Sequence, residues 1–321
     1  MTALYEITNL SKRFTVGSRF SRQGKRVVQA VDGVSLSIQP GETLGLVGES
    51  GCGKSTLGRC LSRLYEISDG KLVFDGTDIS TLSTAQMRPL RRKMQMVFQD
   101  PYASLNPRRR VFDLIAEPLR IHLSLPEAEV KSRVAGLLEQ VGLLPDHAQR
   151  YPHEFSGGQR QRIGIARAIA LEPKLVILDE PVSALDVSVQ AQIVNLLADL
   201  QERLKLTYVF VAHDLSVVRQ VSTRIAVMYL GSIVEIGDAD SIFDRPSHPY
   251  TQALISAVPK PVNSEGRKRI ILTGDVPSPI NPPSGCRFHP RCPVAQDKCR
   301  VDRPTLTVAN GRTVACHFPI I

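Results

Sequence analysis

The 321-residue sequence predicts an α/β fold in which short buried strands run parallel in one sheet and present polar side chains at one edge of it. Two observations support this prediction. A glycine-rich loop at residues 48–55 follows the apolar stretch Thr43 to Val47 and precedes a segment with helical character. Later apolar stretches also end in polar residues. This pattern is typical of a parallel sheet, in which ligands bind beyond the carboxyl ends of the strands.

The first element expected is an antiparallel sheet. Residues 1–40 alternate apolar and polar positions around a basic insert at residues 18–25. Alternation of this kind is typical of half-buried strands, and the insert predicts a long loop between two of them. We expect this sheet to flank the ligand that the glycine-rich loop binds.

The glycine-rich loop reads Gly-Glu-Ser-Gly-Cys-Gly-Lys-Ser and fits the phosphate-binding pattern G-x-x-x-x-G-K-[ST]. Glycines let consecutive amides face one point, and the following helix adds positive charge at its N-terminus. Lys54 is expected to reach the outer phosphates of a nucleoside triphosphate, and the Ser55 hydroxyl to bind magnesium. The other interpretation is a glycine turn with an exposed lysine, but the strand-loop-helix context favours a phosphate site.

The expected nucleotide contacts of this loop are Gly48, Glu49, Ser50, Gly51, Cys52, Gly53, Lys54, Ser55 and Thr56. Cys52 is a variable position of the pattern, and Cys60 falls on the following helix. Both cysteines are therefore interpreted as structural.

Three later apolar stretches end in polar side chains: residues 94–98 before Gln99, residues 175–178 before Asp179 and Glu180, and residues 208–212 before His213. Because the carboxyl ends of parallel strands share one edge, we expect these four side chains to converge on the loop after Val47. Between them, residues 111–149 show helical spacing and predict a helical insertion, and residues 187–205 predict a second amphipathic helix. Both apolar faces are interpreted as core.

Length and composition limit the class of protein. The chain is long enough for two domains, or for one domain with an appendage. No apolar run approaches the roughly 20 residues that span a bilayer, and the first thirty residues lack the apolar core of a signal peptide. We therefore expect the chain to stay in the cytosol, with any membrane spans supplied by other subunits.

The net charge of +9 could indicate a nucleic-acid-binding protein, with basic clusters at residues 91–93 and 108–110. Tryptophan is absent and aromatic residues make up only 5%, which gives little sign of the stacking surfaces that bind single strands. A solvated basic face is favoured, so no nucleic-acid partner is expected. Anionic lipid headgroups or the acidic loops of a partner are the next possibility.

Six motifs carry a family resemblance. They are, in order, the loop at residues 48–55, Gln99, the run Phe155-Ser156-Gly157-Gly158-Gln159, the strand end at residues 175–180, the run at residues 183–186, and His213. In this order and spacing the sequence resembles the ATP-binding cassette ATPases over residues 1–245. Phe155 departs from the commoner leucine. The resemblance implies a P-loop NTPase with a RecA-like core, an antiparallel β subdomain and a helical subdomain at about residues 100–165.

The resemblance also implies roles for these residues. Two cassettes would dimerise head to tail, and Ser156, Gly157, Gly158 and Gln159 would contact the ATP of the partner subunit, with Asp186 acting across the dimer. The implied catalytic residues are Glu180 as general base, His213, Gln99 and Lys54; the implied magnesium ligands are Ser55, Gln99 and Asp179. Phe14 resembles the aromatic residue that stacks on adenine. Phe20 is close enough in sequence to be an alternative, and a core role for Phe14 is equally open.

The C-terminal stretch goes beyond a plain cassette. Residues 246–254 and the proline-rich segment 277–285 resemble the C-terminal extension of peptide-transporter ATPases, which would occupy residues 246–321. The resemblance implies an ATP-binding subunit that powers oligopeptide or dipeptide import from the cytoplasmic face of the bacterial inner membrane. It also implies a sibling ATPase in a heterodimer, two transmembrane permease subunits, and a periplasmic or lipid-anchored substrate-binding protein.

A rival function is that of a soluble cassette ATPase acting on nucleic acid or ribosomes. Such proteins usually carry two cassettes or a long coiled-coil insertion, and this sequence has one cassette and no sustained heptads. Transport is therefore the favoured function. The transported substrate is not specified by these residues.

Four of the six cysteines fall in the extension: Cys286, Cys292, Cys299 and Cys316. In the reducing cytosol this clustering favours a metal centre over disulfides. The paired cysteine hooks of structural zinc sites are absent, which favours a [4Fe–4S] cluster, and resemblance to importers that carry one points the same way. Zinc with help from His289 or His317, and unligated thiols, are the alternatives.

Overall fold

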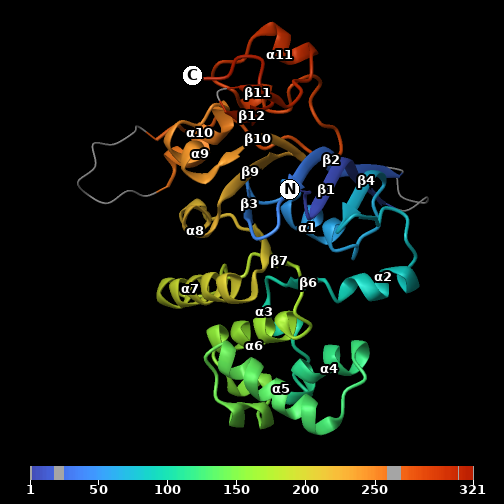
Figure 1. The fold of residues 1–321 in the computed structure, drawn as a ribbon. Coiled ribbons are helices and arrows are strands. Elements are labelled where there is room, and N and C mark those ends of the chain that lie inside the picture. The colour runs from blue at the N-terminus through green and yellow to red at the C-terminus, as the bar shows by residue number, and fades with distance from the viewer. Residues whose placement is uncertain (1, 18–24, 259–268, 310, 321) are drawn as a thin grey trace. The chain divides into compact units, whose positions relative to one another are not determined.

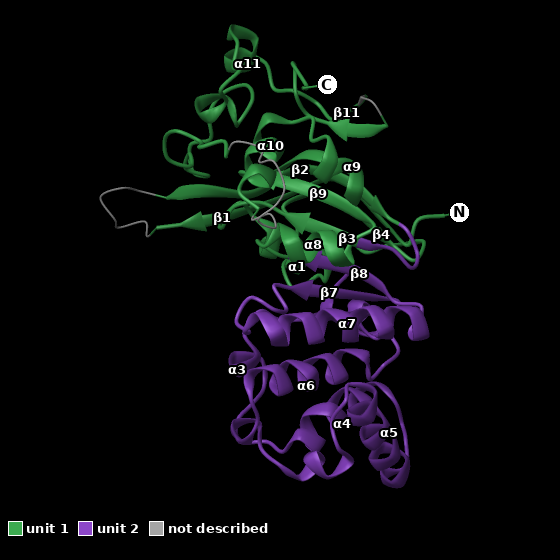
Figure 2. Ribbon diagram, turned by 90° about the vertical axis from the view of Figure 1, so that its left-hand side faces the viewer, with its two compact units in different colours: residues 1–38, 44–81, 212–321 green, residues 39–43, 82–211 purple. Residues whose placement is uncertain are grey.

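The structure is a computed structural model that describes residues 2–17, 25–258, 269–309 and 311–320. The chain divides into two compact units, shown in green and purple in Figure 2. Unit 1 comprises residues 1–38, 44–81 and 212–321, and unit 2 comprises residues 39–43 and 82–211. Each unit has strands, helices and buried apolar side chains of its own.

Unit 1 contains a four-stranded antiparallel sheet with the order β2-β1-β4-β5 (Figure 1). Its strands are β1 (Tyr5–Val16), β2 (Arg26–Ile38), β4 (Asp69–Phe74) and β5 (Thr77–Asp78). Tyr5 pairs with Ile38 on one side and with Phe74 on the other, and all three side chains are fully buried. The antiparallel sheet predicted for residues 1–40 is confirmed. All but the last residue of the predicted insert at 18–25 lies outside the described residues.

A second group of strands in unit 1 runs in the order β11-β12-β10-β9-β3. These strands are β3 (Thr43–Val47), β9 (Arg224–Tyr229), β10 (Ser232–Asp238), β11 (Thr307–Ala309) and β12 (Arg312–Val314). β3 and β9 pair in parallel, with Val47 opposite Val227, and the other pairs are antiparallel. β3 is buried at every position, as expected for an apolar strand covered on both faces.

The helices of unit 1 are α1 (Lys54–Leu61), α8 (Leu215–Val221), α9 (Ala239–Asp244), α10 (Pro249–Ser256), η3 (His289–Arg291) and α11 (Asp297–Val301). An aromatic cluster attaches the C-terminal segment to this unit. Phe288 is fully buried, and its ring centroid lies 5.2 Å from that of Tyr229 in β9 and 5.4 Å from that of Tyr250 in α10. Burying three rings at one point supplies the extension with a core of its own.

His248 gives this region a pH-dependent stability. The side chain is fully buried, and its Nδ1 accepts a hydrogen bond from the backbone N–H of Tyr250 at 3.0 Å, which caps α10. Burial lowers the pKa of His248 from 6.5 to about 3. Below pH 6.5 the unfolded chain therefore binds a proton that the folded chain does not bind until about pH 3, and stability is lost as the pH falls through this window.

We expect this group to lower the free energy of unfolding by about 1.4 kcal/mol for each unit of pH within that window. Urea unfolding at several pH values measures the slope. His248→Asn keeps a side-chain cap without a titratable group, so its slope should be smaller than that of the parent chain. The exposed His153 provides a control, because His153→Asn should leave the slope unchanged. Equal slopes for the parent and His248→Asn would contradict the prediction.

Unit 2 contains a parallel sheet with the order β8-β7-β6. Its strands are β6 (Met94–Val97), β7 (Leu175–Asp179) and β8 (Thr207–Val211). Leu178 lies opposite Val97 on one side and Phe210 on the other. β7 and β8 are buried throughout, which agrees with the uninterrupted apolar runs seen in the sequence.

The helices of unit 2 are α2 (Thr84–Arg91), α3 (Pro101–Ser104), α4 (Val111–His122), α5 (Glu127–Gln140), η1 (Pro145–Gln149), η2 (Pro152–Glu154), α6 (Gly157–Ile169) and α7 (Val187–Leu204). In Figure 2 they form the purple helical part of the chain. The predicted helical insertion at residues 111–149 is confirmed by α4, α5 and η1, and the predicted helix at residues 187–205 by α7. In the part of the chain that the structure describes, no helix is long and apolar enough to cross a membrane.

Candidate active site

The glycine-rich loop lies between β3 and α1 and follows a path that glycine alone allows. Gly48, Gly51 and Gly53 have φ values of 154°, 77° and 106°. A Cβ atom on Gly48 would lie 2.1 Å from the carbonyl oxygen of Met228, and one on Gly53 would lie 2.1 Å from that of Ala30. The loop therefore rests directly on the backbones of β9 and β2, where no side chain fits.

Lys54 begins α1 and folds back over this loop. Its side chain is buried, and Nζ donates hydrogen bonds to the carbonyl oxygens of Gly48 at 2.8 Å and Glu49 at 3.0 Å. Gly53 precedes the helix and provides no side-chain cap, so the first amides of α1 face the loop without a side-chain acceptor. A positive charge and a set of amide donors at one glycine loop fit a triphosphate.

His213 lies close in space to the strand from which the loop begins. The backbone N–H of Ala212 donates to the carbonyl oxygen of Leu46 in β3 at 3.2 Å, and the next residue, His213, is exposed. Unit 1 thus brings His213 and the loop together at the carboxyl end of β3. Phe14 is half-buried, with its ring edge-on to Tyr65 at 5.5 Å and Lys12 Nζ 4.9 Å from its centroid. Phe20 lies outside the described residues.

Unit 2 brings together the carboxylates at the end of β7 and the amide that follows β6. Asp179 is fully buried, and the next residue, Glu180, has a φ of 49°. This left-handed conformation is uncommon for a residue other than glycine, and strain of this kind clusters at functional sites. Gln99 Nε2 donates a hydrogen bond to Glu180 Oε2 at 2.9 Å. The backbone N–H of Glu180 donates to the carbonyl oxygen of Val211 at 2.9 Å and holds the turn against β8.

The run at residues 155–159 forms the start of α6. Ser156 Oγ accepts a hydrogen bond from the backbone N–H of Gln159 at 3.3 Å, and Gln159 Oε1 accepts one from the backbone N–H of Ser156 at 3.1 Å. This capping box begins the helix at Gly157. A Cβ atom on Gly158 would lie 2.4 Å from Val189 Cγ1 in α7, so glycine is required by the close approach of two helices.

The remaining predicted residues also have clear positions. Asp186 is the exposed residue before α7, and its side chain makes no cap there. Phe155 is buried and packs edge-on to His147 at 5.3 Å, which gives it a packing role. Ser55 and Thr56 are half-buried in the first turn of α1, and Cys52 and Cys60 are buried thiols. Hydroxyl, carboxylate and amide oxygens from Ser55, Asp179 and Gln99 are the donor types that magnesium prefers.

The predicted [4Fe–4S] cluster is wrong. Cys286, Cys292, Cys299 and Cys316 line one pocket together with apolar side chains that include Phe288 and Phe318. They are free thiols, and no group of three or more His, Cys, Asp or Glu residues able to hold a metal ion occurs in the described part of the chain, to which all four belong.

Burial keeps three of these four thiols protonated. It raises the pKa of Cys286 and Cys292 and raises that of Cys316 to about 11, whereas metal ligation requires thiolates. The spacing of the four cysteines thus predicted their shared location but not a ligand geometry. The alternative of a zinc site with help from His289 or His317 is wrong for the same reason, because the described residues include no group able to hold a metal ion. The extension is held by its aromatic core and its arginine contacts instead of by cysteine ligation.

Two residues at the glycine-rich loop were missed from the sequence, and both belong to the C-terminal segment. Tyr250 Oη accepts a hydrogen bond from the backbone N–H of Glu49 at 2.9 Å. Arg291 donates to both carboxylate oxygens of Glu49, at 2.7 and 3.0 Å. The partners are 201 and 242 positions apart, and no motif spacing connects them.

Three features define a nucleotide hydrolase of the ATP-binding cassette class. They are a glycine-rich loop with a lysine at the start of a helix, a buried strand that leads into Asp-Glu, and a serine-capped helix. The model of the ABC transporter family matches residues 31–183. The model described as "Oligopeptide/dipeptide transporter, C-terminal region" matches residues 234–299. The chain belongs to the ABC transporter family, among the ATP-binding proteins that carry this C-terminal region, and it is an ATPase.

Relatives match almost the whole chain. The oligopeptide transport ATP-binding protein AppF of Bacillus subtilis is 53% identical over 319 residues, which cover 98% of this chain and 97% of the relative. The oligopeptide transport ATP-binding protein OppF of Salmonella typhimurium is 52% identical, with 98% and 95% covered. The di/tripeptide transport ATP-binding protein DppF of Pseudomonas aeruginosa is 48% identical, with 99% and 98% covered.

Solved structures confirm the predicted cassette fold. A dimeric ATP-binding cassette in a post-hydrolysis state, bound to ADP and Pi, is 28% identical with a TM-score of 0.66, and the match covers 73% of this chain and 98% of that one. CbiO1 of Clostridium perfringens, part of an ABC transporter complex, is also 28% identical, with a TM-score of 0.65 and coverage of 76% and 91%.

Proposed function

We propose that this chain hydrolyses ATP to power the uptake of oligopeptides or dipeptides through membrane subunits that other chains supply. The observation that carries the proposal is the combination, in one chain, of a cassette with a C-terminal region typical of oligopeptide and dipeptide transporters. Relatives named for oligopeptide and for di/tripeptide transport match it along nearly its full length, and this favours transport over the rival role at nucleic acid or ribosomes.

In this proposal residues 1–245 form the cassette, with a helical subdomain at about residues 100–165, and residues 246–321 form the extension. The partners are a sibling ATPase in a heterodimer, two permease subunits, and a periplasmic or lipid-anchored substrate-binding protein. The chain works as a peripheral protein at the cytoplasmic face of the inner membrane. Uptake requires these partners because the described helices include none that could cross a membrane.

The geometry within each unit, taken by itself, supports a role in ATP hydrolysis. In unit 1, the loop at residues 48–56 binds the phosphates through its amides and the Lys54 ammonium, which two carbonyl groups already hold at the loop. In unit 2, Glu180 is the base that accepts a proton from the attacking water, and the hydrogen bond from Gln99 orients its carboxylate. His213, whose neighbour Ala212 is hydrogen-bonded to Leu46 of β3, contacts the terminal phosphate, and Phe14 stacks on adenine.

The oxygen atoms of Ser55, Asp179 and Gln99 would hold magnesium, whose charge neutralises the phosphates. The start of α6 serves the neighbouring subunit. Its capping box places the amides of Gly157 and Gly158 in the first turn of the helix, directly after the exposed Ser156, and Ser156, Gln159 and Asp186 complete this surface. Two such subunits therefore enclose each nucleotide between the loop of one and the α6 start of the other.

Companion proteins test the transport function. A tagged full-length chain, extracted from membranes with mild detergent, is expected to copurify with a second cassette ATPase and two multispanning proteins, identified by mass spectrometry. Lys54→Ala should copurify with the same companions, which would separate assembly from nucleotide binding. Copurification with nucleic acid or ribosomes, with an ATPase activity that nucleic acid stimulates in a salt-sensitive way, would support the rival function instead.

Disulfide crosslinking tests the shared site. In a Glu180→Gln background, which favours the ATP-bound state, Ser156→Cys in this chain is expected to crosslink, when ATP is present, with a cysteine placed in the phosphate loop of the sibling ATPase at the position that corresponds to Ser50. Each single substitution serves as the control for the native cysteines. Failure of the pair to crosslink under saturating ATP would contradict the head-to-tail arrangement.

A further inference from the structure

The phosphate loop contains a carboxylate that must be neutralised before the loop can bind an anion well. Glu49 is the second residue of the loop, and its side chain is 27% exposed. Triphosphates carry several negative charges, and like charges at close range repel each other strongly where water is partly excluded. An unpaired Glu49 would therefore oppose the attraction that Lys54 and the loop amides provide.

Arg291 neutralises this carboxylate from the C-terminal segment. It closes the short helix η3, its side chain is only 8% exposed, and it makes two parallel hydrogen bonds to Glu49. Bidentate arginine-carboxylate pairs fix orientation as well as charge, so this contact holds the Glu49 side chain in one direction. Formation of the pair raises the pKa of Arg291 further, and the guanidinium stays charged.

The backbone of the same loop residue is held by a second group of the C-terminal segment. The Glu49 N–H donates to the hydroxyl of Tyr250, whose ring is fully buried against Tyr229 at 4.7 Å between centroids. Burial raises the pKa of Tyr250, so the phenol remains neutral and can accept this bond. Side chain and backbone of Glu49 are thus both anchored to residues beyond position 245.

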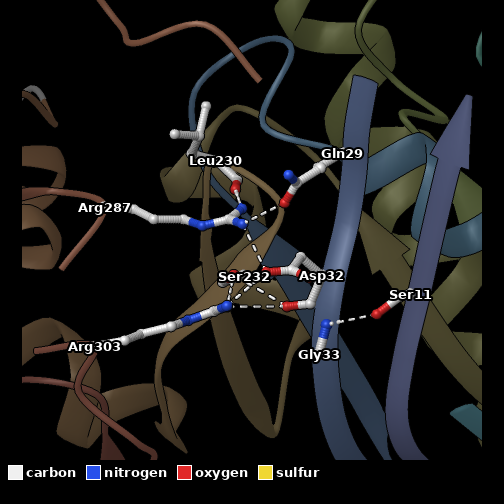
Figure 3. A network of polar contacts seen from close by, with 8 residues as sticks. All are labelled: Ser11, Gln29, Asp32, Gly33, Leu230, Ser232, Arg287 and Arg303. Atoms are coloured by element: carbon white, nitrogen blue, oxygen red, sulfur yellow. Dashed lines mark hydrogen bonds and ion pairs between the residues drawn. The ribbon is translucent and has the colours of Figure 1, made fainter. Parts of the chain in front are cut away.

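The surface beneath the loop is also tied to the C-terminal segment. The backbone N–H of Gly231 donates to the carbonyl oxygen of Cys52 in the loop at 2.8 Å, and Arg287 donates to the carbonyl oxygen of the neighbouring Leu230. Figure 3 shows Arg287 and Arg303 converging on Asp32 of β2, each 2.6 Å from Oδ2. These contacts hold the β9–β10 turn and β2, on which the loop rests.

From this geometry we propose that Arg291 is a positioning residue for ATP: it cancels the charge of Glu49 at the phosphate loop, so that the C-terminal segment sets nucleotide affinity. The inference rests on the proposed assignment of residues 48–56 to the phosphates. It assigns the extension an effect on the affinity of the cassette for ATP, in addition to any contact that it makes with other subunits.

Variants of the full-length chain test this proposal through equilibrium binding of ATP with Mg²⁺ and through steady-state hydrolysis. Arg291→Ala is expected to raise Kd and KM about tenfold, the scale of one lost charge-assisted contact, with kcat changed less than about twofold. The loss should shrink at high salt, because screening weakens the repulsion from Glu49. A purely structural loss would lower thermal stability without this dependence on salt.

A second substitution separates charge from folding. The double variant Glu49→Gln with Arg291→Ala lacks both charges and should bind ATP within about threefold of the parent chain, even though Arg291 is still missing. Glu49→Gln alone leaves Arg291 without its carboxylate and should bind ATP at least as tightly as the parent. If Arg291→Ala does not fold, this single variant decides the question, since weaker binding by Glu49→Gln would overturn the proposal.

A matched control lies in the same segment. Arg300 is 63% exposed and pairs only loosely with Asp297 at 3.9 Å, so Arg300→Ala should leave Kd unchanged. Parent-like Kd for Arg291→Ala, or a double variant as weak as Arg291→Ala, would overturn the proposal. Lys54→Ala in the same assay distinguishes failure of the Arg291 proposal from failure of the phosphate-loop assignment. Loss of ATP binding by Lys54→Ala upholds the loop assignment, whereas normal binding would refute that assignment itself.

Discussion

Replacing Glu180 with glutamine is expected to lower ATP turnover by roughly 100-fold or more and to leave ATP binding intact. Glutamine has nearly the same shape as glutamate and can keep the hydrogen bond to Gln99, which joins Nε2 and Oε2 at 2.9 Å in the parent chain. It cannot accept a proton from water. The substitution therefore removes the base while preserving the turn that holds residue 180 at a φ of 49°.

Steady-state hydrolysis and equilibrium binding of ATP with Mg²⁺ measure the two effects separately. Glu154→Gln is a suitable control, because this glutamate is exposed and its carboxylate accepts from the backbone N–H of Tyr151 at 2.6 Å, a bond that an amide oxygen can also accept. We expect that variant to turn over ATP like the parent. Near-normal hydrolysis by Glu180→Gln would refute the assignment of the base.

Replacing Lys54 with alanine is expected to weaken ATP binding by about 100-fold or more. Its ammonium group is held at the loop by the carbonyl oxygens of Gly48 and Glu49, at 2.8 and 3.0 Å. Hydrogen bonds to charged groups contribute about 1.5–3 kcal/mol each, so losing contacts to two phosphates reaches this scale. Because α1 tolerates alanine well, the fold should survive the change.

Equilibrium binding measures this loss, and thermal unfolding verifies that the variant is folded. Lys71→Ala provides the comparison, since Lys71 is 60% exposed and pairs with Asp78 at 3.6 Å on the antiparallel sheet. That control should bind ATP normally. A folded Lys54→Ala chain with parent-like affinity would mean that the nucleotide binds elsewhere.

The parallel strands around the site could be predicted closely from the sequence because each is a short apolar run with polar ends. β3 spans Thr43–Val47 as predicted, β7 extends one residue beyond the predicted strand, and β8 is shifted by one residue at each end. The start of α6 depends on a local cap that outweighs helix propensity. Glycines at 157 and 158 weaken helix propensity, but the Ser156–Gln159 capping box outweighs them and begins the helix at Gly157.

The candidate site was predictable to a similar degree, since its motifs are local and lie at strand ends. The contacts between the C-terminal segment and the loop were not, because Glu49 and Arg291 are 242 positions apart and neither stands out by composition. For the cysteines, by contrast, the sequence pattern predicted a metal site that the described part of the chain does not contain. Four thiols near one another in sequence do line one pocket, but metal binding also requires deprotonation and ligand geometry, neither of which sequence spacing determines.

The hairpin of β11 and β12 has a consequence for solubility. β12 pairs with β10 through Thr313 and Val314, and β11 then forms the outer strand with only three residues, Thr307–Ala309. A long edge strand has unpaired backbone groups that can pair with a strand of another chain, and a very short edge strand makes such pairing unfavourable. A chain that ended before residue 307 would leave Glu235 and Ile236 of β10 without their partners in β12 and would tend to aggregate.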